Sequence, residues 1–264
     1  MITVKAIYEY LDSRYPYRLQ ESYDNSGIMV DCGREVTKAV VSLDVTRDVI
    51  RYAASAGAEL IVSHHPVIFR PLRQLTHEMP VFALVAHGIS AISAHTNYDI
   101  APGGVNDLLA TKLDLQNIRP IFSVSEQVQD GLVQKNYIGR VGELSKPLSP
   151  GEFADYVMEK LRGRRGVEYV DGGKSIQTVA VGGGACGEFV FECPKNGIDA
   201  FVTGEAKHHE LLYAAQNGIT LIPAGHYATE AVALSGLASA LREGFPTLSV
   251  EVTTLDDPLR FTMQ

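Results

Sequence analysis

Short apolar runs alternate along the chain with segments whose apolar residues have helical spacing. The apolar runs lie at residues 28–30, 39–43, 60–62, 89–94, 167–170, 178–181, 200–203, 219–223 and 248–254. Runs of this length bounded by turn residues are typical of buried strands. The helical segments lie at residues 4–15, 46–56, 78–87, 104–112, 149–161, 188–195 and 207–216, and a long one begins at residue 226. This alternation predicts the α/β class with a largely parallel sheet.

The two halves of the chain repeat one pattern. The turn and strand at 57–63 correspond to 197–203, and those at 88–94 correspond to 218–224. Each member of the second pair is followed by a histidine with a carboxylate four residues later. These pairs are His95 with Asp99 and His226 with Glu230. An internal repeat indicates that the two halves share one architecture. The alternation of strands and helices weakens between residues 114 and 148, which is where we expect the boundary between the halves. We therefore expect one α/β repeat over residues 1–125 and a second over residues 126–264.

Two adjacent histidines end the apolar run at residues 60–62. Pro66 favours extended backbone at His65, and neighbouring side chains on extended backbone point in opposite directions. His64 and His65 are therefore unable to clasp one ion easily, but each can serve one of two ions. The alternative is a pair of histidines that pack or form hydrogen bonds at the end of a strand.

Polar side chains follow three predicted strands. They are His64 and His65, His95 with Asp99, and His226 with Glu230. Ligands of open α/β sheets collect beyond the carboxyl ends of the strands. Imidazoles combined with carboxylates suit zinc, iron, manganese or cobalt, whereas calcium and magnesium prefer oxygen ligands alone. Two such ions activate water for hydrolysis of phosphate esters, amides or ring C=N bonds. The alternative to a metal site is that these polar side chains lie apart from one another and form hydrogen bonds with the backbone at the strand ends.

A glycine-rich loop at residues 182–187 offers a competing interpretation. Gly182, Gly184 and Gly187 fit GxGxxG after a strand, and Glu205 follows at the distance of a dinucleotide fingerprint. Close approach to a phosphate, or a tight turn at a subunit contact, would also explain the glycines. Downstream, Glu205 or His209 could lie behind the metal ligands or in a substrate pocket, or His209 could belong to an exposed helix turn.

Arginines at positions 70 and 73 follow the histidine pair closely. They could meet an anionic substrate or be ordinary surface residues. We interpret His77 and His87 as structural, because no carboxylate lies at a useful spacing.

Composition narrows the class of protein. The 264 residues are 45% hydrophobic and 20% charged, which is ordinary for a soluble globular protein with a real core. The net charge of −8 argues against a general nucleic-acid or membrane surface, although a local basic patch remains compatible with it. Three widely spaced cysteines favour a reducing compartment. The sequence contains neither a signal-peptide pattern nor an apolar run of about 20 residues, so we expect a cytoplasmic protein.

Three blocks resemble the signature motifs of the NIF-three-like family of dinuclear metal proteins, the GTP cyclohydrolase I type 2 homologues. The blocks are SHHPVIF at residues 63–69, SAHTNYD at 93–99 and GHYATE at 225–230. DNSGI at 24–28, SLDVT at 42–46 and GGG at 182–184 are similar to further family blocks. The resemblance spans nearly the whole chain.

This resemblance implies two intertwined α/β repeats with mixed, mostly parallel sheets and the metal site between them. It implies a homohexameric ring, and the short form of the family that lacks an inserted middle domain. The implied ligands of two divalent ions (zinc, iron or manganese) are His64, His65, Asp99, His226 and a bridging Glu230. His95 is then a neighbour of the ions rather than a ligand.

Three functions follow as hypotheses. The first is a metal-dependent hydrolase of a nucleotide-like small anionic substrate, GTP cyclohydrolase-type by resemblance, with His95 and His209 as proton-transfer candidates. The second is a non-catalytic protein that binds, stores or delivers metal. The third is regulatory nucleotide binding through the glycine-rich loop.

Overall fold

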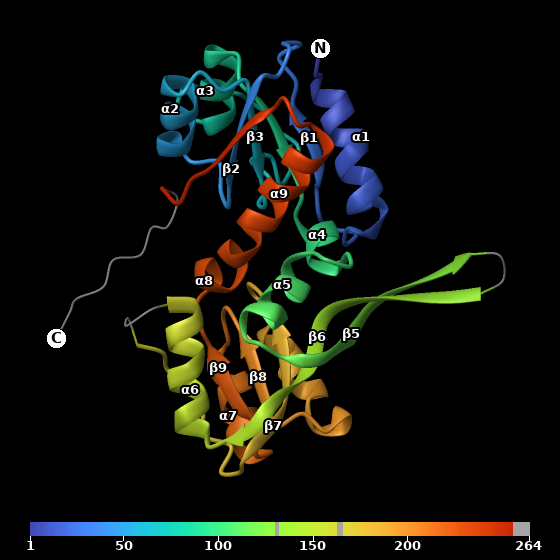
Figure 1. Cartoon of the computed structure of the whole chain (residues 1–264), viewed down its shortest axis with the longest axis vertical. Helices are drawn as coiled ribbons and strands as arrows, with labels where there is room; N and C mark the ends of the chain where they lie inside the picture. Colours follow the sequence, from blue (N-terminus) through green and yellow to red (C-terminus); the bar gives the residue numbers. More distant parts are fainter. Residues whose placement is uncertain (130–131, 163–165, 256–264) are drawn as a thin grey trace. The chain divides into compact units, whose positions relative to one another are not determined.

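The computed structural model describes residues 1–129, 132–162 and 166–255. These residues fall into two compact units (Figure 1). The first consists of residues 1–102 together with 233–255, and the second consists of the described residues from 103 to 232. Residues 233–255 therefore belong to the same unit as the N-terminus. The boundary expected between residues 125 and 126 lies within a strand of the second unit.

The first unit is built on a five-stranded sheet of order β1-β4-β3-β2-β10. Only β1 is antiparallel to its neighbour. The strands are β1 (Gly27–Val30), β2 (Lys38–Ser42), β3 (Leu60–Ser63), β4 (Ser90–Ser93) and β10 (Ser249–Val252). The helices are α1 (Val4–Arg14), the 3-10 turn η1 (Tyr17–Leu19), α2 (Arg47–Ser55), α3 (Pro80–His87), α4 (Thr96–Ile100) and α9 (Leu234–Gly244).

The second unit has a five-stranded sheet of order β5-β6-β7-β8-β9. Its β7, β8 and β9 are parallel, whereas β5 and β6 form an antiparallel hairpin. The strands are β5 (Gln116–Gln129), β6 (Leu132–Leu148), β7 (Ile176–Gly182), β8 (Ala200–Thr203) and β9 (Thr220–Pro223). The helices are α5 (Val105–Lys112), α6 (Pro150–Val157), η2 (Met158–Arg162), η3 (Gly187–Glu192), η4 (Pro194–Asn196), α7 (His208–Gln216), α8 (His226–Glu230) and η5 (Ala231–Ala233). Both sheets confirm the predicted α/β class.

The strand registers match the internal repeat. Val40, Ile61 and Ala91 are neighbours on β2, β3 and β4, and Ala180, Phe201 and Leu221 occupy the same order on β7, β8 and β9. The first two strands of each set are separated by 21 residues in both units. The next interval is 30 residues in the first unit and 20 in the second. The first unit therefore has a longer connection between β3 and β4.

Four elements differ from the pattern-based expectation. Residues 116–129 and 132–148 form two long paired strands, and residues 123–126 are all at least partly exposed, so their sequence need not alternate. Residues 167–170 form only one bridge, from Val170 to Leu221. The expected helix at 188–195 is two 3-10 turns separated at Cys193, because Pro194 cannot donate a backbone hydrogen bond. The long helix from 226 is divided into α8, η5 and α9.

Each sheet is covered by its own core. In the first unit, Val40, Ile61 and Leu84 are fully buried in one apolar cluster, and in the second unit Phe153 and Val202 lie in another. Burying apolar area contributes about 25 cal/mol per Å², so these clusters hold the strand ends in place. The polar residues that follow each strand are positioned by this rigid framework.

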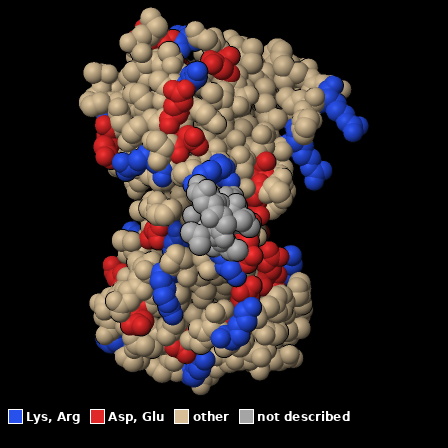
Figure 2. Space-filling model, turned by 90° about the vertical axis from the view of Figure 1, so that its right-hand side faces the viewer, with Lys and Arg blue, Asp and Glu red and all other residues tan. Residues whose placement is uncertain are grey.

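Charge on the surface is mixed. Acidic and basic side chains are interspersed over the face that Figure 2 draws, so the residues drawn there offer nucleic acid no broad basic surface. In the described part of the chain, no helix combines the length and the apolar character needed to cross a membrane.

Candidate metal centre

Serines at the ends of three adjacent strands of the first unit position the polar residues that follow them. Ser42, Ser63 and Ser93 are at most 1% exposed. The Ser42 and Ser63 hydroxyls each donate to a carbonyl two residues later, those of Asp44 and His65, at 2.8 Å. The Ser93 hydroxyl donates to the His64 carbonyl at 2.7 Å. Such local hydrogen bonds turn the backbone as it leaves the sheet, which fixes where the polar side chains begin.

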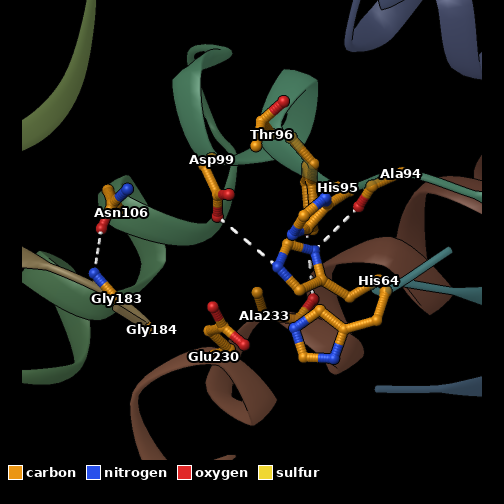
Figure 3. A network of polar contacts seen from close by, with 12 residues as sticks. His64, Ala94, His95, Thr96, Asp99, Asn106, Gly183, Gly184, Glu230 and Ala233 are labelled. Atoms are coloured by element: carbon orange, nitrogen blue, oxygen red, sulfur yellow. Dashed lines mark hydrogen bonds and ion pairs between the residues drawn. The ribbon is translucent and has the colours of Figure 1, made fainter. Parts of the chain in front are cut away.

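His64 is buried and its tautomer is determined by its surroundings. Its Nδ1 lies 2.8 Å from the carbonyl oxygen of Ala94 (Figure 3). A carbonyl can only accept, so Nδ1 carries the proton and Nε2 keeps its lone pair. That Nε2 lies 3.6 Å from Oδ1 of Asp99 on α4. His64 and Asp99 therefore present a nitrogen and an oxygen donor to one small region.

Carboxylates orient two further histidines in the same manner. Nδ1 of His65 is 2.9 Å from Asp44, and Nδ1 of His95 is 2.7 Å from Asp24. The rings of these histidines and His64 contact one another, with centroids 4.9 to 5.4 Å apart. One ring nitrogen from each lies within 4.8 Å of the others. The structure thus brings His95 into direct contact with the predicted histidine pair.

Asp24 is buried under this cluster and is strongly hydrogen-bonded. Its side chain is 0% exposed, and it accepts from the Thr96 amide at 3.1 Å and the Thr96 hydroxyl at 2.6 Å. Burial raises the pKa of the Asp24 carboxyl, but hydrogen bonds from His95 and Thr96 lower it by more than burial raises it. The pKa of Asp24 therefore lies well below its usual range. An ionised Asp24 therefore holds the ring of His95 in one orientation.

In the second unit, one short helix carries a histidine and a carboxylate. His226 begins α8 and Glu230 ends it, so the two side chains share a face, as the spacing predicted. Nε2 of His226 lies 3.1 Å from Oε2 of Glu230. Nδ1 of His226 lies 2.9 Å from Oε1 of Glu205, which follows β8. Glu230 is buried, at 4% exposure.

The glycine-rich loop packs against this helix instead of forming an open anion cradle. The Gly183 amide donates to Asn106 at 2.8 Å (Figure 3). The Gly184 amide donates to the Thr229 hydroxyl at 3.0 Å. Amides engaged in this way are not directed at a phosphate. A Cβ on Gly184 would overlap Oε1 of Glu230. The glycines therefore admit Glu230, and the dinucleotide interpretation loses its support.

His209 lies on the first turn of α7 with its side chain 64% exposed. Its ring stacks on Phe191 at 6.1 Å, and its Nε2 is 3.9 Å from Glu210. Among the described residues, no ring contact or ion pair joins His209 to His226. Its proposed role in proton transfer stays a prediction.

Sequence reasoning missed two carboxylates that orient the histidines, Asp24 and Asp44. Both end or precede strands next to those that bear the histidines, in the order β1-β4-β3-β2. The strand order explains both, because the ends of the parallel strands β2, β3 and β4 meet the start of the antiparallel strand β1 at one edge of the sheet. The third such carboxylate, Glu205, had been expected behind the ligands or in a pocket.

The donor set fits a borderline divalent metal. Groups of His, Asp and Glu that could hold an ion occur among the described residues. Four imidazoles have their Nδ1 atoms engaged by a carbonyl or carboxylate, which leaves each Nε2 as the donor. Metal-binding histidines have this arrangement, because the outer partner fixes the ring and raises its basicity.

The chain is similar to several known proteins. A chain of Streptomyces coelicolor named GTP cyclohydrolase 1 type 2 homolog is 33% identical over 229 residues, covering 83% of this chain and 79% of its own. One of Clostridium perfringens with the same name is 31% identical, covering 86% and 87%. The crystal structure of Staphylococcus aureus hypothetical protein SA1388 superposes with a TM-score of 0.89 at 28% identity, covering 99% of each chain. The family described as Duf34/NIF3 (NGG1p interacting factor 3) matches residues 2–258, and the chain belongs to that family.

Proposed function

We propose that the chain binds two divalent metal ions and hydrolyses a small, nucleotide-like anionic substrate. The proposed ligands are His64, His65, Asp99, His226 and Glu230, with Glu230 bridging. The observation that supports this most strongly is the shared orientation of the histidines, each with Nδ1 engaged and Nε2 presented.

Zinc, iron or manganese are the ions that this donor set favours. When bound, a pair of such ions polarises the substrate and activates water near neutral pH. The residues of the chain hold the ligand side chains in position. Asp44 and Glu205 hold the rings of His65 and His226, and Gly184 leaves room for the Glu230 carboxylate.

His95 is the group that we propose for proton transfer. Its Nδ1 is held by Asp24, so Nε2 is the atom that exchanges a proton with the substrate or with water. The Asp24 carboxylate stabilises the imidazolium that forms. His209 remains a second candidate, since its imidazole is exposed and can be reached from solvent.

The substrate class rests on the names of the relatives. Both curated relatives are called GTP cyclohydrolase 1 type 2 homolog, and we propose the corresponding ring-opening hydrolysis of a purine nucleotide as the first reaction to test. The test is turnover of GTP and a panel of nucleotides by metal-loaded protein. Wild type should turn over a substrate and Glu230→Gln should not. Equal activity of the two proteins would contradict the proposal.

Metal storage or delivery is the second candidate function. The side chains of His65 and His226 are 22% and 35% exposed, so part of the donor set can be reached by a partner. Metal that passes to a competing chelator within minutes, together with no turnover of any nucleotide, would favour this function over hydrolysis.

We also propose a homohexameric ring in the cytoplasm. Apolar side chains exposed on α3, Phe82 at 42% and Val85 at 53%, suit a contact between copies. The three cysteines are free thiols, which suits a reducing compartment. Light scattering on the purified chain tests the assembly, and a mass near six chains supports it.

A further inference from the structure

The connection between β3 and α3 is much longer than its counterpart in the second unit. It covers residues 64–79, whereas β8 and α7 are joined by residues 204–207. This connection begins with the two histidines of the metal centre. Loops of about 12 to 15 residues without secondary structure are uncommon in compact domains, and they often bind ligands. The extra residues therefore lie where a substrate of the metal centre would be met.

Two aromatic side chains connect this loop to the histidine cluster. The ring of Phe69 is 6.3 Å from that of His95, and the ring of Tyr23 is 6.5 Å from that of Phe69. Phe69 is 42% exposed and Tyr23 is 62% exposed. A line of rings thus runs from the cluster toward solvent. Exposed aromatic faces beside a reactive site are suited to stacking on a planar ring.

The loop also carries local positive charge. Residues 66–77 contain Arg70 and Arg73 and no carboxylate, in a chain of net charge −8. Within the described residues, neither guanidinium forms an ion pair, whereas Arg14 pairs with Glu243 and Arg140 pairs with Asp107. Arginines without a protein partner next to a binding site suit an anionic ligand group.

The loop is anchored at both ends but not in its middle. The Asn25 amide donates to the Ile68 carbonyl at 2.6 Å, and Arg47 donates to the His77 carbonyl at 3.3 Å. Between these anchors, the described structure records no hydrogen bond from residues 69–75. Those residues are all exposed. The segment can therefore adjust around a ligand while its two ends stay fixed.

We propose that the loop at residues 64–79, together with Tyr23, binds and selects the substrate of the metal centre. Phe69 and Tyr23 stack on a planar heteroaromatic ring, and Arg70 and Arg73 bind an anionic group attached to it. The inference rests on the proposed function for the identity of the neighbouring site. It adds the residues that select the ligand.

The test is binding rather than turnover. Wild type and variants are titrated with GTP, guanosine and inorganic tripolyphosphate by calorimetry, with and without metal. Phe69→Ala should weaken GTP and guanosine binding about ten-fold and leave tripolyphosphate unchanged. Arg70→Gln/Arg73→Gln should weaken GTP and tripolyphosphate about ten-fold and leave guanosine unchanged. Tyr23→Ala should weaken the binding of GTP and guanosine, whereas Tyr23→Phe, which keeps an aromatic ring, should bind both like wild type.

Matched controls lie elsewhere on the chain. Tyr169 has the same 42% exposure as Phe69, and Arg119 is exposed and lacks an ion pair among the described residues. The inference is overturned if Phe69→Ala binds GTP like Tyr169→Ala, if the double arginine variant binds it like Arg119→Gln, or if wild type binds none of the three probes.

Metal content separates failure of this inference from failure of the proposed function. If the inference is correct, all loop variants keep the wild-type metal content while their affinity for GTP falls. A wild type that binds GTP through Phe69 but holds no metal would refute the metal centre and keep the loop. Full metal content with GTP affinity unchanged by Phe69→Ala would do the reverse.

Discussion

Gly184 and the carboxylate of Glu230 are packed so closely that no side chain fits at position 184. A Cβ built there would overlap Oε1 of Glu230 and would lie 3.3 Å from Nε2 of His226. Gly184 also has a φ of +64°, which favours glycine. The loop that resembles a dinucleotide motif is therefore a support for two proposed metal ligands.

Gly184→Ala should displace Glu230 and weaken metal binding about ten-fold, because an outer support of the ligand is lost. The measurement is metal affinity by competition with a chelator. Gly173→Ala is the control, because Gly173 has a φ of +72° but open space around its Cβ position. Both variants should lose about 1 kcal/mol of stability. Equal metal affinity in the two would show that the close packing does not matter.

Asp44→Asn should reduce metal affinity by roughly ten-fold, because the carboxylate that orients His65 loses its charge. Asp48→Asn, on the exposed surface of α2, is the matched control and should bind metal like wild type. The same chelator competition measures both. Wild-type metal affinity in Asp44→Asn would contradict the role of Asp44 in orienting His65.

Asp24 should make stability depend on pH in the acid range. Its pKa is below the ordinary value in the folded chain, so its contribution is complete above the unfolded pKa of about 3.9 and is lost as the pH falls toward the folded pKa. Urea unfolding of metal-free protein between about pH 3 and 6 should show this loss. Asp24→Asn should be less stable near neutral pH by about 2 kcal/mol and have a flatter profile. A profile as steep as that of wild type would contradict the assignment.

The sequence predicted residues that act at the end of their own strand. His64 and His65 follow an apolar run, and His95 and His226 each precede a carboxylate by four residues. Strand order was not available from that pattern. Asp24 lies 71 residues before His95, and Asp44 lies 21 residues before His65. Their pairing depends on which strands are neighbours, so it could not be predicted locally.

The packing of the glycine-rich loop and the pairing of β5 with β6 could not be predicted from the sequence, for different reasons. The Gly184 amide is bound by Thr229, 45 residues later, so its partner is set by tertiary packing. The β5–β6 hairpin is exposed on both faces over residues 123–126, so burial imposed no alternation on the sequence. Repeat order and fold class were predictable, because they depend on the buried strands alone.

His95→Gln should keep metal and lose turnover at least a hundred-fold, because a proton-transfer group is removed while the ligands stay. Metal content and turnover are measured on the same preparation. His209→Gln, tested in parallel, decides whether the exposed imidazole takes part. Loss of metal from His95→Gln would instead make His95 a ligand, which its ring contacts with His64 and His65 would allow.

The central claim is that the chain holds two ions through His64, His65, Asp99, His226 and Glu230. The most direct test is the metal content of protein purified without added metal, for wild type and for His65→Ala/Glu230→Ala. The account predicts about two equivalents per chain in wild type and loss of most of them in the double variant. Wild type that binds no ion, even after incubation with zinc, manganese or iron(II), would contradict it.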